Sequence, residues 1–213
     1  MSISALRHRI LTALADSAAP RDPAVAAPPA AYGDVPEGLR RHFAGRKTPA
    51  GVLIALLARG ADYHVLFTRR SPDLRHHPGQ VSFPGGRMEP EDRDVTDAAL
   101  REAEEEVGLP RRHVRIAGYL ESHLTITGYA VTPVVGLVHQ GFEIRVDPGE
   151  VEEAFEVPLD FLMDRRNLRR AWREFEGNEI PVYEYHYGGH RIWGATASML
   201  VTLRDKLEVP VKQ

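Results

Sequence analysis

The sequence predicts an α/β domain of the α+β kind, with a mixed β-sheet and few helices. The chain has 213 residues, of which 43% are apolar and 27% charged, and this composition suits one globular domain with a sizeable core. Short apolar runs typical of strands outnumber the helical patterns. Strand and helix patterns also do not alternate regularly, which argues against a doubly wound parallel sheet.

The N-terminal region is predicted to precede the main domain. Ile3, Leu6, Ile10 and Leu14 recur at helical spacing, which indicates a helix that packs on the domain or contacts a second copy in a homodimer. An organelle-targeting helix is the alternative. Residues 17–36 are rich in Ala and Pro, a composition that favours a semi-rigid linker or a surface arm. We therefore divide the chain into an N-terminal helix and arm (1–48), a main domain (49–208) and a tail (209–213).

The main domain is predicted to begin with a hairpin. Apolar runs at 51–57 and 63–68 flank a turn at 59–62. A basic run at 165–173 is interpreted as a solvated helix face or loop, with a contact to a phosphate group of the ligand or to a nucleic acid as the alternative. The other predicted elements are strands at 80–83, 114–123, 130–138 and 155–157, a helical turn at 38–43, and helices at 94–107, 158–164 and 196–206.

The charge balance and the cysteine count exclude several classes of function. The chain has 27 Lys plus Arg and 30 Asp plus Glu, a net charge of -3, so it has no overall basic field to hold a nucleic acid. With no cysteine, it has no disulfide, thiolate zinc site, iron–sulfur cluster or cysteine nucleophile. No apolar run approaches the roughly 18 residues of a transmembrane helix. We expect a cytoplasmic protein that binds neither membrane nor nucleic acid.

Residues 94–109 carry the strongest helix signals. Asp94 is the expected N-cap, with Asp97 three residues on as a shortened capping box. Gly108 is the expected C-terminal stop. At about 100° per residue, one side of this helix forms an apolar stripe of Ala99, Leu100, Ala103 and Val107.

The same helix gathers Glu102, Glu105 and Glu106 on another face. Like charges at this spacing destabilise an isolated helix by about 0.2 to 0.5 kcal/mol per pair, and only Arg101 is placed to relieve Glu105. A divalent metal would meet this need, because Mg²⁺ usually bridges protein carboxylates to substrate phosphates. The alternative is a solvated acidic face. Paired glycines at 85–86 favour the metal, since backbone there can approach a ligand closely.

Residues 86–109 resemble the Nudix box. The pattern of that family is Gly, five residues, Glu, seven residues, and then Arg-Glu-apolar-any-Glu-Glu-any-Gly-apolar. Residues 101–109 match its last nine positions. Upstream the chain departs from the pattern, because Asp92 stands where Glu is expected and eight residues instead of seven separate it from Arg101.

This resemblance implies a Nudix-type α/β/α sandwich. It also implies hydrolysis of a nucleoside diphosphate linked to another group, with Mg²⁺ or Mn²⁺ as cofactor. By the resemblance Glu102, Glu105 and Glu106 bind the metal together with the backbone of Gly86, and Glu105 also belongs to the catalytic residues. Arg101 would orient a box carboxylate.

The general base is not identifiable from the box, since in Nudix enzymes it is a box glutamate or an acid from a distant loop. Three glutamates, Glu150, Glu152 and Glu153, lie in an acidic stretch ahead of the strand predicted at 155–157. We predict Glu150 as the additional ligand or base. An ordinary polar loop is the alternative.

The stretch 66–86 is similar to the signature of the coenzyme A pyrophosphatase branch of this family. In that branch an Arg-Ser, a Leu-Arg, a His and a Gly-Gln-Val lead into Phe-Pro-Gly-Gly. The resemblance implies cleavage of coenzyme A or a derivative to 4′-phosphopantetheine and adenosine 3′,5′-bisphosphate. Arginine suits such a substrate because its guanidinium binds phosphate bidentately. The substrate contacts expected in this chain are Arg69, Arg70, Arg75, His77 and Gln80.

Two other functions remain open from the sequence. The first is a Nudix hydrolase of another nucleoside diphosphate derivative such as ADP-ribose, or of a nucleoside triphosphate. The second is a non-catalytic nucleotide sensor. The complete set of box glutamates argues against the sensor, because a binding module need not keep three mutually repelling carboxylates.

Overall fold

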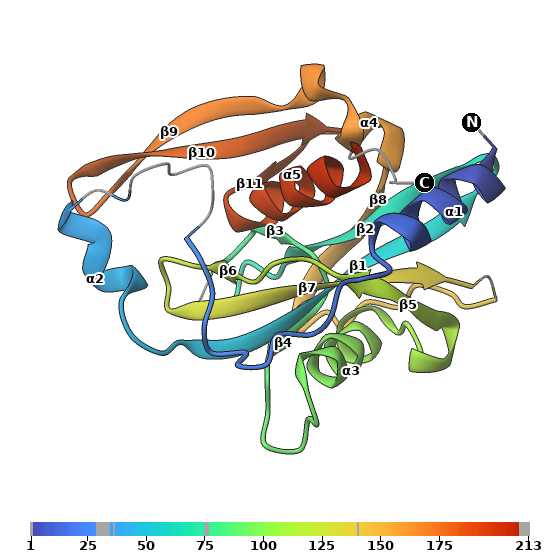
Figure 1. Cartoon of the computed structure of the whole chain (residues 1–213), viewed down its shortest axis with the longest axis horizontal. Coiled ribbons are helices and arrows are strands. Elements are labelled where there is room, and N and C mark those ends of the chain that lie inside the picture. Colours follow the sequence, from blue (N-terminus) through green and yellow to red (C-terminus); the bar gives the residue numbers. More distant parts are fainter. Residues whose placement is uncertain (1, 29–34, 36, 75–76, 140, 209–213) are drawn as a thin grey trace.

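A mixed β-sheet lies at the centre of the molecule, with helices on both faces (Figure 1). The computed structural model describes residues 2–28, 35, 37–74, 77–139 and 141–208. In this part of the chain the sheet has eight strands, in the order β3-β2-β1-β7-β5, with β4 beside β1, β6 beside β7 and β8 beside β2. The predicted α/β class with a mixed sheet is confirmed, because β1 and β7 are parallel and the other pairs are antiparallel.

The strand β1 is the centre of this sheet and is buried on both faces. Leu53, Ala55 and Leu57 face one layer of the core, and Ile54 and Leu56 face the other. This explains its continuous apolar sequence, which shows no alternation with polar residues. The strands of the sheet are β1 Thr48–Arg59, β2 Asp62–Arg70, β3 Val81–Ser82, β4 Gly85–Arg87, β5 Val114–Tyr119, β6 His123–Leu124, β7 Tyr129–Val138 and β8 Val151–Pro158.

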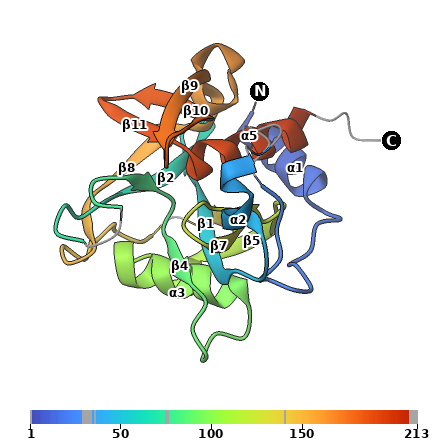
Figure 2. The same cartoon turned by 90° about the vertical axis from the view of Figure 1, so that its left-hand side faces the viewer.

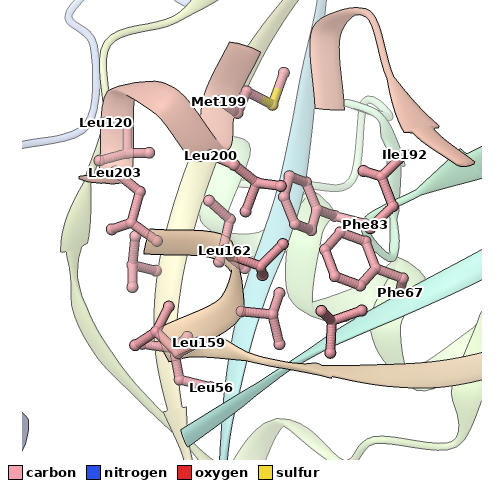
Figure 3. Close-up of a cluster of buried hydrophobic side chains, with 14 of the residues drawn as sticks. Leu56, Phe67, Phe83, Leu120, Leu159, Leu162, Ile192, Met199, Leu200 and Leu203 are labelled. Atoms are coloured by element: carbon pink, nitrogen blue, oxygen red, sulfur yellow. The ribbon is translucent and has the colours of Figure 1, made fainter. Parts of the chain in front are cut away.

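One helix covers one face of the sheet and three helices cover the other (Figures 1 and 2). The helix α3 (Val95–Val107) packs so closely on β1 that a Cβ at Gly51 would collide with the Val95 carbonyl. The helices α1 (Ile3–Ala13), α4 (Leu159–Met163) and α5 (Ala195–Glu208) lie on the opposite face. Figure 3 shows their core, in which Leu159, Leu162 and Leu200 pack with Phe67 and Phe83. The α/β/α layering expected from the resemblance is therefore present.

A second, three-stranded antiparallel sheet lies among the described residues and was not predicted from the sequence. Its strands are β9 (Arg169–Phe175), β10 (Asn178–Tyr187) and β11 (His190–Trp193). The interpretation of 165–173 as a solvated helix face or loop is wrong, since a short 3₁₀ turn at Arg165–Asn167 leads into β9. The strand signal was hidden because Arg169, Arg170 and Arg173 interrupt the apolar residues of β9, and Arg173 packs over Trp193.

Several other predicted boundaries also change. The strand predicted at 114–123 is broken into β5 and β6, and its pairing with β7 shifts register at Gly118, which has a φ of +154°. In the acidic stretch ahead of 155–157, Glu152 and Glu153 belong to β8 instead of a loop, whereas Glu150 lies in the turn just before that strand. The predicted helical turn at 38–43 is observed. The short helical segments are η2 Glu37–Leu39, α2 Arg40–Phe43, η3 Arg111–His113 and η4 Arg165–Asn167.

The N-terminal helix and the start of the arm pack on the domain. Ile10 and Leu14 of α1 are fully buried in the main core, so the interpretation as a packed helix is confirmed. The arm is attached through Ala24, whose carbonyl accepts a hydrogen bond from Lys47, and through a β-bridge from Ala27 to β6. The rest of the arm at 29–34 and the tail at 209–213 lie outside the described residues. Within the described part, no helix is long and apolar enough to cross a membrane.

Candidate active site

The helix α3 begins and ends where the sequence predicts. Asp94 is the N-cap, and its side chain accepts hydrogen bonds from the backbone N–H groups of Thr96 and Asp97. Gly108 ends the helix in the left-handed conformation, with a φ of +66°. The capping box is altered, because the Asp97 carboxylate accepts from the backbone N–H of Arg93 instead of Asp94. These two caps fix where the helix begins and ends, and so they fix the positions of the acidic residues along it.

Three carboxylates from two distant parts of the chain converge beside α3. Among the described residues, one oxygen each of Glu102, Glu106 and Glu150 can be chosen so that all three lie within 4.8 Å of one another. Glu105 does not belong to this group: its side chain is 59% exposed, and it accepts a hydrogen bond of 3.0 Å from Arg101. The predicted Glu150 thus lies with two box glutamates.

Backbone hydrogen bonds bring Glu150 to the helix. The segment after β7 is attached to the C-terminal end of α3, because Asp147 donates its N–H to the Glu106 carbonyl at 3.0 Å. Glu150 donates its own N–H to the Asp147 carbonyl at 3.1 Å. On its other side, the Glu150 carbonyl accepts the N–H of Ser71, just after β2, at 2.8 Å. Glu150 is therefore held between the helix and the stretch predicted to bind substrate.

The paired glycines allow the carboxylates to lie against the backbone of β4. Gly85 has a φ of +151°, and its N–H donates to Glu106 Oε2 at 3.2 Å. At Gly86 an added Cβ would collide with the carboxylate of Glu102. Any side chain at position 86 would therefore displace a member of the cluster, which is why glycine is required there.

The cluster is electrostatically unfavourable by itself. Burial raises the pKa of Glu106 to about 8, and the neighbouring Glu102 and Glu150 add to this, against the Gly85 N–H and Arg70. Burial also raises the pKa of Glu102. Glu106 is only 2% exposed, so its negative charge is costly unless a cation compensates it. Oxygen ligands at this spacing, in a chain without cysteine, fit a hard divalent cation such as Mg²⁺ or Mn²⁺.

Arg101 connects the helix to the preceding loop. Its guanidinium donates to both carboxylate oxygens of Asp92, at 3.1 and 3.0 Å, and to Glu102 at 2.9 Å and Glu105 at 3.0 Å. Hydrogen bonds to Asp92 are the main cause that raises the pKa of Arg101. Asp92 is buried and also accepts the N–H of Glu89 at 2.8 Å.

The sequence left the role of Asp92 open. In the structure it anchors Arg101, which donates to both of its carboxylate oxygens. Its position in the box, where the family has Glu, was the signal for this role.

The predicted substrate residues at the end of β2 have different surroundings. Arg70 Nη1 lies 3.8 Å from Glu106 Oε1, beside the cluster. Arg69 instead contacts Glu152 and Glu153 on β8, at 3.2 and 3.1 Å. Arg75 lies outside the described residues.

His77 and Gln80 belong to the turn that follows β2. The His77 carbonyl accepts the N–H of Gln80 at 3.2 Å, and the Gln80 carbonyl accepts the N–H of Arg70 at 3.0 Å. His77 has a positive φ of 56°, which is uncommon for a residue other than glycine. These bonds fold the turn back onto the end of β2, close to the cluster.

Comparison with known proteins gives a consistent family likeness. A family model described as the NUDIX domain matches residues 47–176. A protein of Photorhabdus laumondii subsp. laumondii, named "Uncharacterized Nudix hydrolase NudL", is 39% identical over 160 residues, which cover 75% of this chain and 85% of that protein. A protein of the same name from Yersinia pestis (strain Pestoides F) is 36% identical over 168 residues, covering 79% of this chain and 84% of that protein.

Solved structures of low sequence identity also align with the chain. A MutT/nudix family protein from Enterococcus faecalis aligns with a TM-score of 0.47 and 13% identity, over 80% of this chain and 63% of that one. The NUDIX domain of Shewanella oneidensis NrtR, solved in complex with ADP ribose, aligns with a TM-score of 0.44 and 14% identity, over 56% of this chain and 78% of that one.

Proposed function

Because the chain belongs to the Nudix family, and is therefore a hydrolase of a nucleoside diphosphate derivative, we propose that its substrate is coenzyme A or an acyl derivative of it. Water would add to one phosphorus of the diphosphate, and the bond from that phosphorus to the bridging oxygen would break. The products would be 4′-phosphopantetheine and adenosine 3′,5′-bisphosphate. The observation that carries the proposal is the coenzyme A signature at 66–86, whose Arg70 lies 3.8 Å from Glu106 Oε1.

The carboxylates of the cluster would bind the cofactor, Mg²⁺ or Mn²⁺. A divalent cation bound there would neutralise the diphosphate and stabilise charge that develops during cleavage. Glu102, Glu106 and Glu150 support this role by their spacing. For Glu105 to join them, as the family resemblance implies, its carboxylate would have to exchange Arg101 for the cation. The same resemblance assigns the backbone of Gly86 to the metal.

The substrate would be oriented by the end of β2 and the turn that follows it. Arg70 is the cation suited to the diphosphate, because among the described residues its buried Nε has no hydrogen-bond partner and its ion pair with Glu106 is long, at 3.8 Å. A phosphate would accept hydrogen bonds from this guanidinium. His77 and Gln80, in the turn closed onto Arg70, are proposed as further contacts.

A comparison of substrates tests this proposal. The protein is incubated with Mg²⁺ or Mn²⁺ and with coenzyme A, ADP-ribose or a nucleoside triphosphate, and the products are identified by mass. We expect 4′-phosphopantetheine and adenosine 3′,5′-bisphosphate, with kcat/KM highest for the coenzyme A class. Faster turnover of ADP-ribose or a triphosphate would overturn the assigned substrate. Tight binding of a nucleotide with no metal-dependent product would instead indicate a sensor.

A further inference from the structure

The strand that follows Glu150 is irregular at the point where it reaches the site. In the antiparallel pair of β2 and β8, Arg69 lies opposite Glu153, but the next residue, Arg70, lies opposite Val151. Glu152 is therefore an extra residue on β8 and forms a β-bulge. Bulges bend a strand and change the direction in which its side chains point, and they are frequent beside active sites.

Arg69 contacts the extra residue, Glu152, and the residue that follows it, Glu153. Its Nη2 lies 3.2 Å from Glu152 Oε1 and 3.1 Å from Glu153 Oε2. In a regular strand, consecutive side chains point to opposite faces and would not meet at one nitrogen atom. A single guanidinium therefore contacts two adjacent carboxylates in the geometry that the bulge creates, and would lose one of them if β8 became regular; His190 Nε2 also lies 3.6 Å from Glu153 Oε1.

The direction of Glu150 depends on this bulge. Glu150 precedes Val151 directly, and its carbonyl is already tied to Ser71 at 2.8 Å. Because side chains on a strand alternate, a shift of one residue in the pairing of β8 would turn the side chains before the bulge to the other face of the sheet. The carboxylate of Glu150 would then leave Glu102 and Glu106.

We propose that Arg69 is a positioning residue, which holds the bulge in β8 and so aims Glu150 at the cation site. Its action is on the cation ligands and not on the substrate, which separates it from Arg70, its neighbour in the sequence. The inference rests on the proposed binding of a divalent cation by Glu102, Glu106 and Glu150. It does not depend on coenzyme A being the substrate.

Cation binding by four variants, measured without nucleotide, tests this role. Mn²⁺ affinity is determined by calorimetry for Arg69→Met, Glu150→Gln, the double variant and Arg59→Met. Arg59 is the matched control, because it forms the same kind of ion pair with β8, 2.6 Å from Glu156 Oε1, away from the bulge. Residues that orient metal ligands typically contribute about 10- to 100-fold in affinity. We expect Arg69→Met and Glu150→Gln each to weaken Mn²⁺ binding about 10-fold or more, and Arg59→Met to leave it unchanged.

Coupling between the two substitutions is the decisive result. If Arg69 acts through Glu150, the double variant binds Mn²⁺ no more weakly than Glu150→Gln alone. If the loss of Mn²⁺ affinity in the double variant equals the product of the two single losses, the proposal is overturned. Normal Mn²⁺ binding by Arg69→Met with a raised KM, which is the behaviour of a substrate contact, would also overturn it.

Turnover gives a second measure that a merely structural role would not reproduce. With any substrate that the wild type cleaves, Arg69→Met should lower kcat with KM little changed, whereas Arg70→Met should raise KM. Arg69→Lys should recover part of the Mn²⁺ affinity, since a lysine keeps the positive charge that both glutamates contact at one nitrogen but lacks the planar guanidinium. If Arg69→Lys binds Mn²⁺ no more tightly than Arg69→Met, the proposal that the positive charge of residue 69 holds the bulge is contradicted.

Two further outcomes are separable from these. If Arg69→Met does not fold, the paired substitution Glu152→Gln with Glu153→Gln removes the same ion pairs from the other side, and it must then weaken Mn²⁺ binding. If the wild type does not cleave coenzyme A, the proposed substrate fails, but the Mn²⁺ measurements still decide the role of Arg69.

Discussion

The helix α3 and the strand β8 serve the same carboxylate cluster, but their residues arrive there by different means. Glu102 and Glu106 are four residues apart on one helix, so the helical repeat alone puts them on one face. Glu150 comes from a segment 44 positions after Glu106 in the numbering, and it is held by backbone hydrogen bonds to α3 and to the end of β2. Two ligands are therefore specified locally, and the third depends on the tertiary fold.

This difference teaches where the site is robust and where it is sensitive. A change on α3 acts on a ligand directly and leaves the helix able to form, since its caps and apolar stripe are elsewhere. A change near β8 acts through the register of a strand pair that already contains a bulge. Substitutions in the two regions should therefore differ in what they alter: the charge of the site in the first case, and its geometry in the second.

The largest effect is expected for a substitution on α3, where the ligands are specified locally. Glu106→Gln removes the buried charge of the cluster and keeps the shape of the side chain, so the fold should survive. We expect kcat to fall by at least about 1000-fold, equivalent to about 4 kcal/mol of transition-state stabilisation. Steady-state kinetics measures the loss, and circular dichroism checks the fold. The control is Glu104→Gln, an exposed residue of the same helix. Retention of more than about a tenth of the activity would refute the role of Glu106.

The second prediction concerns pH and the same residue. Burial raises the folded-state pKa of Glu106 from 4.5 to about 8, so between these values the folded protein holds a proton that the unfolded chain has released. The free energy of unfolding of the metal-free protein should therefore fall as pH rises through this window, by at most about 1.4 kcal/mol per pH unit. Below about pH 4.5 the contribution of this group should be fully present.

Chemical denaturation across the pH window, in the presence of a chelator, measures this effect. Glu106→Gln should remove the fall, because the amide does not titrate. Mn²⁺ should oppose it in the wild type, since a bound cation replaces the proton. If the free energy of unfolding depends on pH identically in the wild type and in Glu106→Gln, the conclusion that the metal-free cluster is electrostatically unfavourable is contradicted.

The local region was also the part that could be predicted from the sequence. The N-cap Asp94, the stop at Gly108 and the apolar stripe of α3 depend on residues within one or two turns of one another. The hairpin of β1 and β2 and the parallel partner β7 were likewise visible as apolar runs. Glu150 was named as a candidate, but only tertiary hydrogen bonds account for its place beside Glu106.

The second sheet could not be predicted for a physical reason of its own. Arg173, Arg191 and His186 all surround Glu184, which is only 9% exposed, so paired charges lie on the same face of this sheet as the buried Ile180 and Val182. These charges interrupt the alternation of apolar and polar residues that predicts a strand. The bulge in β8 could not be predicted for a different reason, because the register of a strand depends on its partner strand and not on its own sequence alone.

A third prediction tests how the loop before α3 supports the local ligands. Asp92→Ala removes the partner that accepts two hydrogen bonds from Arg101. Hydrogen bonds to charged groups contribute about 1.5 to 3 kcal/mol, so the free energy of unfolding should fall by about 2 kcal/mol. Denaturant titration measures the change, with Glu91→Ala, an exposed neighbour, as the control. A loss as small as that of the control would show that Arg101 is held by the glutamates alone.

The smallest effect is expected in the second sheet, which lies outside the comparison because none of Glu102, Glu106 and Glu150 is on it. Trp172 on β9 is 57% exposed, and Arg170 packs over its ring at 5.6 Å from the centroid. Because little apolar surface is buried there, Trp172→Ser should change the free energy of unfolding by no more than about 0.5 kcal/mol. Turnover should be unchanged. A raised KM in this variant would instead indicate that the basic run at 165–173 meets a phosphate of the substrate, and the cluster beside α3 would then not be the only part of the molecule that binds it.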